Sequence, residues 1–169
     1  KERFDIRMGY IHFADGEYND AYPYFVRIKE SSQYYPHALY FLSYIAYSKQ
    51  EYEEAAEGFT KLKDNDDYGR LVPYYLLQIE YRNQNYNYVA DNGENLLNSA
   101  TDEVRDDLVR VMAESFFEAG DYAQALRYIS QYPAELMGRQ ENYIKGYSLY
   151  RLAMHEQAIA PLAAACGKR

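Results

Sequence analysis

The sequence lacks most of the features on which catalytic or metal chemistry depends. It has no tryptophan and a single cysteine, Cys166, so no internal disulfide can form. There is no glycine-rich phosphate-binding loop and no His-Glu-x-x-His run, and His12, His37 and His155 lie far apart in the sequence. These absences predict a protein that is not an enzyme, with no catalytic residues, no metal site and no cofactor.

Two further absences limit the partners. No run of about 18 apolar residues occurs, which predicts that no segment of this sequence spans a membrane. The 18 lysines and arginines are outnumbered by 26 aspartates and glutamates, and the formal net charge is -8. Nucleic-acid binding depends on clustered basic side chains that neutralise phosphates, and no such cluster is present. We therefore expect a protein or peptide partner and not nucleic acid.

Tyrosine, by contrast, is abundant, with 22 copies in 169 residues, and it marks a repeat. The motif Gly-x-Tyr-x-x-Ala occurs at residues 16–21 and 120–125, and residues 52–55 repeat it without the glycine. A fixed period near 34 residues is typical of stacked helical hairpins. The landmarks of the repeat, spaced by 34, 34, 36 and 33 residues, are Tyr18, Tyr52, Tyr86, Tyr122 and His155.

Apolar residues on both sides of each landmark follow helical spacing. In the second repeat, Leu39 and Leu42 share one face before the turn, which predicts an amphipathic helix. Gly16 suits the left-handed conformation that ends a first helix. The third repeat is the least regular, because Gln84 stands in place of the turn glycine and Gly93 in place of a large second-helix side chain. We expect this repeat to be the loosest, since it loses buried apolar area.

These patterns predict an all-α fold: a right-handed α-α superhelix, or solenoid, of about five helical hairpins in a single domain, residues 1–169. The repeats are expected at residues 2–35, 36–69, 70–105, 106–138 and 139–169. The sequence begins at Lys1 and ends without the polar capping helix that solenoids need. We expect a fragment of a longer protein, from which a signal peptide could have been removed, with an uncapped C-terminal end through which copies could form a homo-oligomer.

The repeats resemble those of the tetratricopeptide repeat (TPR) family over almost the whole chain. That motif has a small residue in the first helix, glycine then tyrosine at the turn, and alanine then a large side chain in the second helix. The resemblance implies a non-enzymatic scaffold that holds peptides or partner helices on a concave face. The matching residues are Gly9, Gly16, Tyr18, Ala21 and Phe25, then Tyr52, Ala55 and Phe59, then Ala113, Gly120, Tyr122 and Ala125, then Gly146, Ala158 and Leu162.

The resemblance also implies that the first helix of each hairpin lines the concave groove. The repeat register assigns 30 positions to this groove, and 13 of them hold Tyr or Phe, against 16 of the other 139 positions. Tyrosine supplies rigid contact area with a polar tip, as binding surfaces require. We therefore predict a peptide-binding groove. The residues expected to contact the ligand are Tyr40, Tyr44, Tyr47, Tyr74, Tyr81, Tyr147 and Tyr150, with Arg82 and Arg151 orienting it.

Three alternatives remain open at this point. Some of these tyrosines could only fill the space between successive first helices. The groove could instead stack sugar rings, as in a glycan-binding module, or the chain could be a structural segment of a longer solenoid whose own residues fill the groove. Chaperone-binding members of the family use a Lys and Asn clamp, whose places here hold Ile6, Tyr10 and Phe41, so that ligand is not expected. The repeat style resembles bacterial envelope proteins, which favours the periplasm or cell envelope over the cytoplasm.

Overall fold

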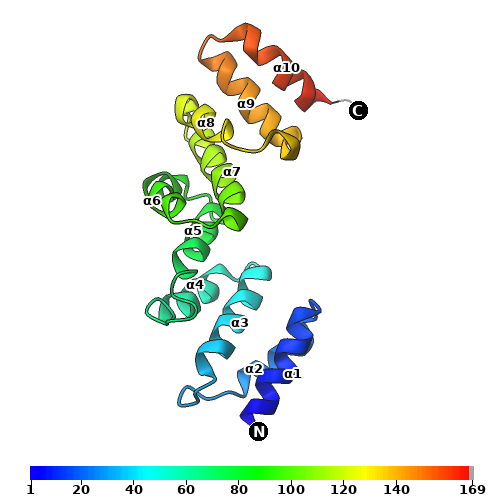
Figure 1. Ribbon diagram of the computed structural model, residues 1–169, viewed down its shortest axis with the longest axis vertical. Coiled ribbons are helices and arrows are strands. Elements are labelled where there is room, and N and C mark those ends of the chain that lie inside the picture. Colours follow the sequence, from blue (N-terminus) through cyan, green and yellow to red (C-terminus); the bar gives the residue numbers. More distant parts are fainter. Residues whose placement is uncertain (168–169) are drawn as a thin grey trace. The chain divides into compact units, whose positions relative to one another are not determined.

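The computed structural model describes residues 1–167 of the chain, and within them it contains ten α-helices, one short 3-10 helix and no strand (Figure 1). No helix among these residues is both long enough and apolar enough to cross a membrane. The all-α prediction is confirmed. In chain order the helices are α1 (Glu2–Ala14), α2 (Tyr18–Val26), α3 (Tyr35–Ser48), α4 (Tyr52–Lys61), α5 (Val72–Arg82), α6 (Tyr86–Asn98), α7 (Asp102–Glu118), α8 (Tyr122–Ile129), η1 (Ala134–Leu136), α9 (Arg139–Arg151) and α10 (His155–Cys166).

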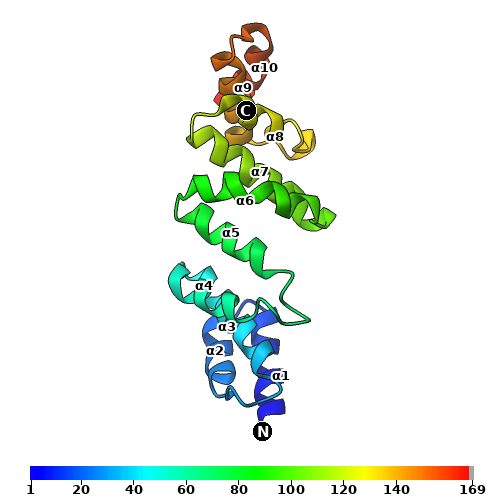
Figure 2. The ribbon, with the colours of Figure 1, turned by 90° about the vertical axis from the view of Figure 1, so that its left-hand side faces the viewer.

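The helices form two compact units, Lys1–Ile79 and Glu80–Arg169. In the first unit, α1 packs on α2, α3 packs on α4, and α2 and α3 join these hairpins (Figures 1 and 2). In the second unit, α7 pairs with α8 and α9 with α10, while α6 packs on α7 and α8 on α9. The boundary falls within α5, in the third repeat, and the expectation of one continuous solenoid domain stays a prediction.

Every hairpin turn has the same backbone geometry, whether or not it contains glycine. The residue two positions before each second helix has a positive φ, between 63° and 81°. This left-handed conformation costs an L-residue roughly 1–2 kcal/mol but reverses the chain after the first helix. Gln84, expected to weaken the third turn, adopts the same φ as the glycines. The five residues with this conformation are Gly16, Gln50, Gln84, Gly120 and Ala153.

An aromatic pair closes each of these turns. The last aromatic side chain of the first helix contacts the first residue of the second helix, five positions later, with ring centroids 5.1–6.2 Å apart. The landmark tyrosines of the repeat are therefore partners of groove-side aromatics. The pairs are Phe13–Tyr18, Tyr47–Tyr52, Tyr81–Tyr86, Phe117–Tyr122 and Tyr150–His155.

Glycines inside the helices permit close helix packing. A Cβ added at Gly9 would lie 2.5 Å from the Phe25 ring, so only glycine lets α1 approach α2 this closely. Gly93 was expected to loosen the third repeat, but it is buried in the second unit, and the Met112 side chain of α7 occupies the adjacent space. A flexible methionine from the next helix thus replaces the expected large residue of α6.

Candidate functional site

Four of the predicted contact tyrosines gather around Tyr75 in the first unit. The rings of Tyr40, Tyr44 and Tyr47 each lie 6.1 Å from Tyr75, edge-on, and the ring of Tyr74 lies 5.7 Å from it. The Tyr40 and Tyr75 hydroxyls are hydrogen-bonded at 2.9 Å. All five side chains are half-buried. This group, the Tyr75 cluster, therefore joins the inter-helix core to the groove side of α3.

Tyr75 anchors the cluster in the core. Its ring stacks face to face on the buried Phe59 ring, with centroids 4.4 Å apart and planes within 2°. Burial, followed by the hydrogen bond with the Tyr40 hydroxyl, raises the pKa of Tyr75 above its ordinary value. The alternative that groove tyrosines fill space between helices thus holds in part for Tyr40 and Tyr44, each of which contacts several rings.

A separate apolar recess opens beside the Tyr75 cluster, between α1, α3 and the turn that precedes α5. Its volume is about 470 Å³. The Tyr10 and Phe41 rings, 5.7 Å apart, form one wall, and Tyr10 and Ile11 are each 53% exposed, so their apolar surface faces solvent. We call this hollow the α1–α3 recess. Its lining residues are Ile6, Arg7, Tyr10, Ile11, His37, Phe41 and Tyr68.

Tyr68 is the most constrained part of the α1–α3 recess. Its hydroxyl lies 2.6 Å from His37 Nδ1, and its ring stacks on Tyr40 with centroids 4.4 Å apart. Burial, the nearby Asp67 carboxylate and Tyr40 together raise the pKa of Tyr68 to about 12. The neutral phenol therefore stays fixed at physiological pH and links the recess to the Tyr75 cluster.

The second unit carries another aromatic group on α9. The rings of Tyr143 and Tyr147 stack at 5.6 Å, and those of Tyr147 and Tyr150 lie 6.1 Å apart. The Arg151 guanidinium donates to the hydroxyls of Tyr122 and Tyr147, each at 3.3 Å, and lies 4.7 Å from the centre of the Tyr122 ring. Arg151, predicted to orient a ligand, is thus already held by its own chain.

Tyr81 and Arg82, the other predicted contacts, lie at the end of α5. The Tyr81 ring contacts Tyr86 as the third turn pair, at 6.2 Å, and Arg82 is exposed. Because Tyr47, Tyr81 and Tyr150 all belong to turn pairs, three of the nine predicted contacts also hold a hairpin together. No feature of the structure tests whether any of the nine binds a ligand, and they stay predictions.

Some residues of these sites could not be identified from residue spacing in the sequence. Tyr10 and Phe41 lie on the first helices α1 and α3, but they are not among the nine predicted contacts. Tyr68 lies outside the first helices, so the repeat register assigned it no groove position, and only tertiary contact with His37 shows its role. Tyr122 was known only as a turn landmark, although its hydroxyl and ring both bind Arg151.

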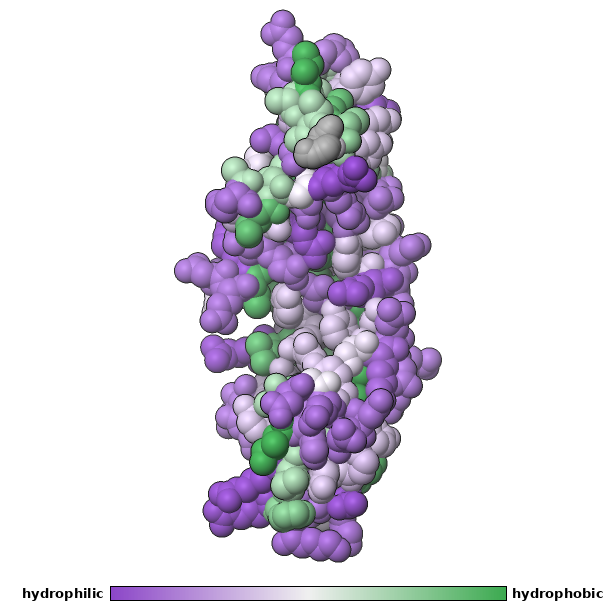
Figure 3. Space-filling model, turned by 90° about the vertical axis from the view of Figure 1, so that its right-hand side faces the viewer, coloured by the Kyte–Doolittle hydropathy of each residue, from purple (hydrophilic) through white to green (hydrophobic). Residues whose placement is uncertain are grey.

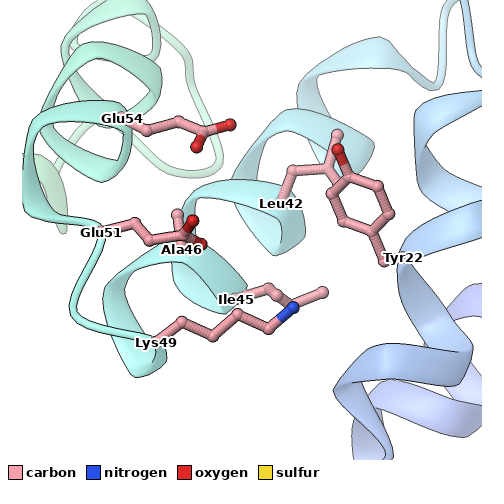
Figure 4. Close-up of a pocket in the computed structure, with 7 residues that line it drawn as sticks. All are labelled: Tyr22, Leu42, Ile45, Ala46, Lys49, Glu51 and Glu54. Carbon is pink, nitrogen blue, oxygen red and sulfur yellow. The ribbon is translucent and has the colours of Figure 1, made fainter.

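Two mixed-charge groups in the first unit are weaker candidates. One is a recess of about 160 Å³, where the Lys49 amine lies 5.8 Å from the centre of the Tyr22 ring. Figure 4 shows Lys49 extending toward Tyr22, with Glu51 and Glu54 on the side of the recess away from Tyr22. On α1, His12 Nδ1 lies 2.8 Å from a carboxylate oxygen of Glu17, and the ligand atoms of these two residues and Asp20 fall within 4.8 Å of one another. Glu17 and Asp20 follow the turn, so helical spacing around His12 did not reveal this group.

Comparison with known proteins bears on the fold. No family model and no curated protein matches the sequence. The chain is similar to solved structures of MamA from Desulfovibrio magneticus RS-1, at 12% identity and a TM-score of 0.75 over 98% of this chain and 93% of that one. MamA AMB-1 gives 13% identity and a TM-score of 0.78, covering 97% and 89%. A thermophilic TPR protein of Thermus thermophilus gives 20% identity and a TM-score of 0.53, covering 98% and 90%.

These likenesses show the fold alone, because all three identities are low. The chain has the helical solenoid fold of TPR-type proteins, as its repeat pattern predicts. Proteins with this fold are generally interaction scaffolds, and their functions differ at the level of individual surface residues.

Proposed function

We propose that the chain is a non-enzymatic protein-interaction scaffold that binds a peptide or partner segment in a tyrosine-rich groove. The observation that carries the proposal is the open α1–α3 recess, whose apolar lining includes the half-exposed Tyr10 and Ile11. On the face seen in Figure 3, apolar side chains form only small, separate patches within a hydrophilic surface. An apolar hollow rimmed by tyrosine is the kind of surface that binds a ligand.

Binding at this recess would rely on shape and stacking, without chemical change. Its aromatic walls are fixed before a ligand arrives, because Tyr68 is hydrogen-bonded to His37 and stacked on Tyr40. A preformed surface loses little conformational entropy on binding, and buried aromatic contacts then supply most of the affinity.

A peptide array tests the proposal, followed by affinity measurements on single variants. We expect Tyr10→Ala to weaken a captured peptide by about tenfold or more, the loss of one aromatic anchor. Tyr22→Ala is the matched control, because Tyr22 is also substantially exposed, at 42%, but lies in the separate recess of Figure 4. Equal effects of the two variants, with unchanged circular dichroism, would contradict binding at the α1–α3 recess.

Tyr44→Ala combined with Tyr81→Ala is a poorer test of binding. Tyr44 contacts the rings of Phe13 and Tyr18, and Tyr81 closes a turn. Truncating both removes packing as well as any ligand contact. We therefore expect this double variant to lose thermal stability whether or not the groove binds a peptide.

Glycan binding is the second candidate, and exposed rings on α9 favour it. Tyr143 and Tyr150 are 45% and 50% exposed, and sugar rings stack on accessible aromatic faces. A glycan array run beside the peptide array separates the two functions. If the chain were instead a structural segment of a longer solenoid, neither array would give binding.

The class of partner and the cellular location are two further parts of the proposal. We expect protein or peptide partners and no nucleic acid, since the net charge is -8. We also propose that the protein is located in the periplasm or cell envelope of a bacterium, because its repeats resemble those of bacterial envelope proteins. The cytoplasm is the alternative location. Cell fractionation of the source organism with an antibody to this chain would test the location.

A further inference from the structure

The arginines on the groove side of the first helices differ in how they are paired. Arg110 donates to Asp107 at 2.7 Å and lies 3.8 Å from Glu114, so its charge is neutralised within α7. Arg151 is stacked and hydrogen-bonded to tyrosines of its own unit. The Arg7 side chain, in contrast, makes no hydrogen bond, ion pair or ring contact with any residue in the part of the chain described, although it lines the α1–α3 recess.

The surroundings of Arg7 do not neutralise it. Among the described residues that line the α1–α3 recess there is no aspartate or glutamate. Asp5, on the same helix, is buried with its carboxylate 3.4 Å from Arg27, on the side facing α2. Arg3, exposed and four residues before Arg7 on α1, adds a second positive charge about one helical turn away. In a chain of net charge -8, this end of the recess is therefore locally positive.

The opposite end of the α1–α3 recess has a different character. Tyr68 is hydrogen-bonded to His37, and the negative charge of the nearby Asp67 carboxylate disfavours loss of the phenolic proton. A negatively charged ligand group is thus disfavoured beside Tyr68 and favoured beside α1. Between these ends, Ile6, Ile11 and Phe41 offer only apolar surface. The recess thus has a cation on its α1 side, apolar walls, and a phenol with an acidic neighbour on the side of the turn that precedes α5.

We infer that the α1–α3 recess binds a peptide segment in which a bulky apolar side chain is flanked by an aspartate or glutamate. The apolar side chain lies against Tyr10 and Phe41, and the ligand carboxylate pairs with the Arg7 guanidinium. Arginine suits this role because it presents paired donors that match a carboxylate. The inference rests on the proposed function and adds to it the chemical class of the ligand.

A peptide library tests this choice of ligand. The protein is panned against displayed random octapeptides whose C-termini are fused or amidated, so that only side chains can supply a carboxylate. We expect selected sequences to combine a Leu, Ile, Phe or Tyr with a neighbouring Asp or Glu. For one such amidated peptide, changing its acid to the amide should lower affinity about tenfold, the usual loss of a charge-assisted hydrogen bond.

Variants assign the effect to Arg7. Arg7→Gln should lower affinity for the acidic peptide about tenfold yet leave affinity for its amide analogue unchanged, while Tyr10→Ala should weaken both peptides. Lys29→Gln is the matched control, because it also removes one exposed positive charge from the first unit but lies outside the recess. Added salt should weaken the acidic peptide more than the amide analogue.

Four results would overturn the inference. Selected peptides with no acidic preference, or equal effects of Arg7→Gln and Lys29→Gln, would leave the proposed groove in place but remove its specificity for acidic segments. Binding only to peptides with a free C-terminal carboxylate, screened beside the library as a separate set, would assign the recess to chain ends instead. If no peptide is selected, while circular dichroism shows a folded protein, both the inference and the proposed peptide-binding function fail.

Discussion

Gly9 and Gly93 are both buried helix glycines, but the side chains opposite them differ in stiffness. At Gly9 an added Cβ would meet the ring of Phe25, at 2.5 Å, and a buried ring cannot yield without moving the helices. At Gly93 it would meet the Sδ of Met112, at 2.8 Å, at the flexible end of an unbranched side chain. Local stiffness, more than distance, decides what each position tolerates.

Alanine substitutions should therefore differ between the two positions. We expect Gly9→Ala to destabilise the protein, because overpacking costs about 1–3 kcal/mol and exceeds the helix-propensity gain of roughly 1 kcal/mol. Gly93→Ala should change the free energy of unfolding by less than about 1 kcal/mol. Urea denaturation measures both. In a double-mutant cycle, Phe25→Leu should relieve part of the Gly9→Ala penalty, and strict additivity would show that Phe25 is not the obstacle.

Tyr68 gives a prediction that depends on pH. Its pKa is raised from 10 in the unfolded chain to about 12 in the folded one, so the folded state holds the phenolic proton more tightly. The stabilisation is complete below pH 10 and is lost as pH rises from 10 through 12. Tyr68→Phe should cost about 1 kcal/mol at pH 7, for the lost bond to His37. The difference in free energy of unfolding between wild type and Tyr68→Phe should shrink as the pH rises through that range. Urea denaturation that gives the same difference at pH 7 and at the alkaline end of the range would refute the prediction.

At the hairpin turns, different residue types adopt the same backbone conformation. All five turns contain a residue with positive φ, yet two hold glutamine and one holds alanine at that position. An aromatic pair packs across each of the turns without glycine, and we infer that this contact offsets the strain of the positive φ. This explains how the third repeat keeps its turn without a glycine.

Glycine exchange at the turns tests this account. Ala153→Gly should stabilise the protein by about 0.5–1 kcal/mol, because relief of the left-handed strain exceeds the added entropy of the unfolded chain. Gly120→Ala is the converse variant and should destabilise by a similar amount, since a Cβ there would meet no atom within 4 Å and only the backbone is affected. Calorimetric melting temperatures that move in the same direction for both would contradict the strain explanation.

For the whole molecule, association between copies stays a prediction. The α10 helix exposes apolar side chains, with Ile159 68% exposed, whereas Leu126 at the corresponding position of α8 is half-buried in the second unit. If copies associate through this surface, the mass measured by light scattering should rise with concentration. Ile159→Glu should then give a monomer at every concentration, with Glu156→Gln, exposed on the same helix, as the control. A monomeric wild type would refute the prediction.

The sequence by itself determined the helices, their pairing into hairpins and the repeat period. Those features depend on local spacing: Leu39 and Leu42 share a helix face, and Tyr52 follows Tyr47 by the five residues that bring their rings together across a turn. Local geometry fixes such contacts wherever the pattern occurs, so they could be predicted without the fold. The enrichment of aromatic residues on the first helices could be predicted from the sequence for the same reason.

Only the tertiary structure decided which aromatics form core contacts and which remain accessible. Tyr75 and Tyr10 both lie on first helices of their hairpins, but Tyr75 stacks on Phe59 and is half-buried, while Tyr10 is 53% exposed beside the α1–α3 recess. Likewise, Arg151 and Arg7 look equivalent in sequence, yet only Arg151 meets tyrosines of its own chain. Burial and charge pairing depend on neighbours far away in sequence, and their positions are fixed only when the helices pack.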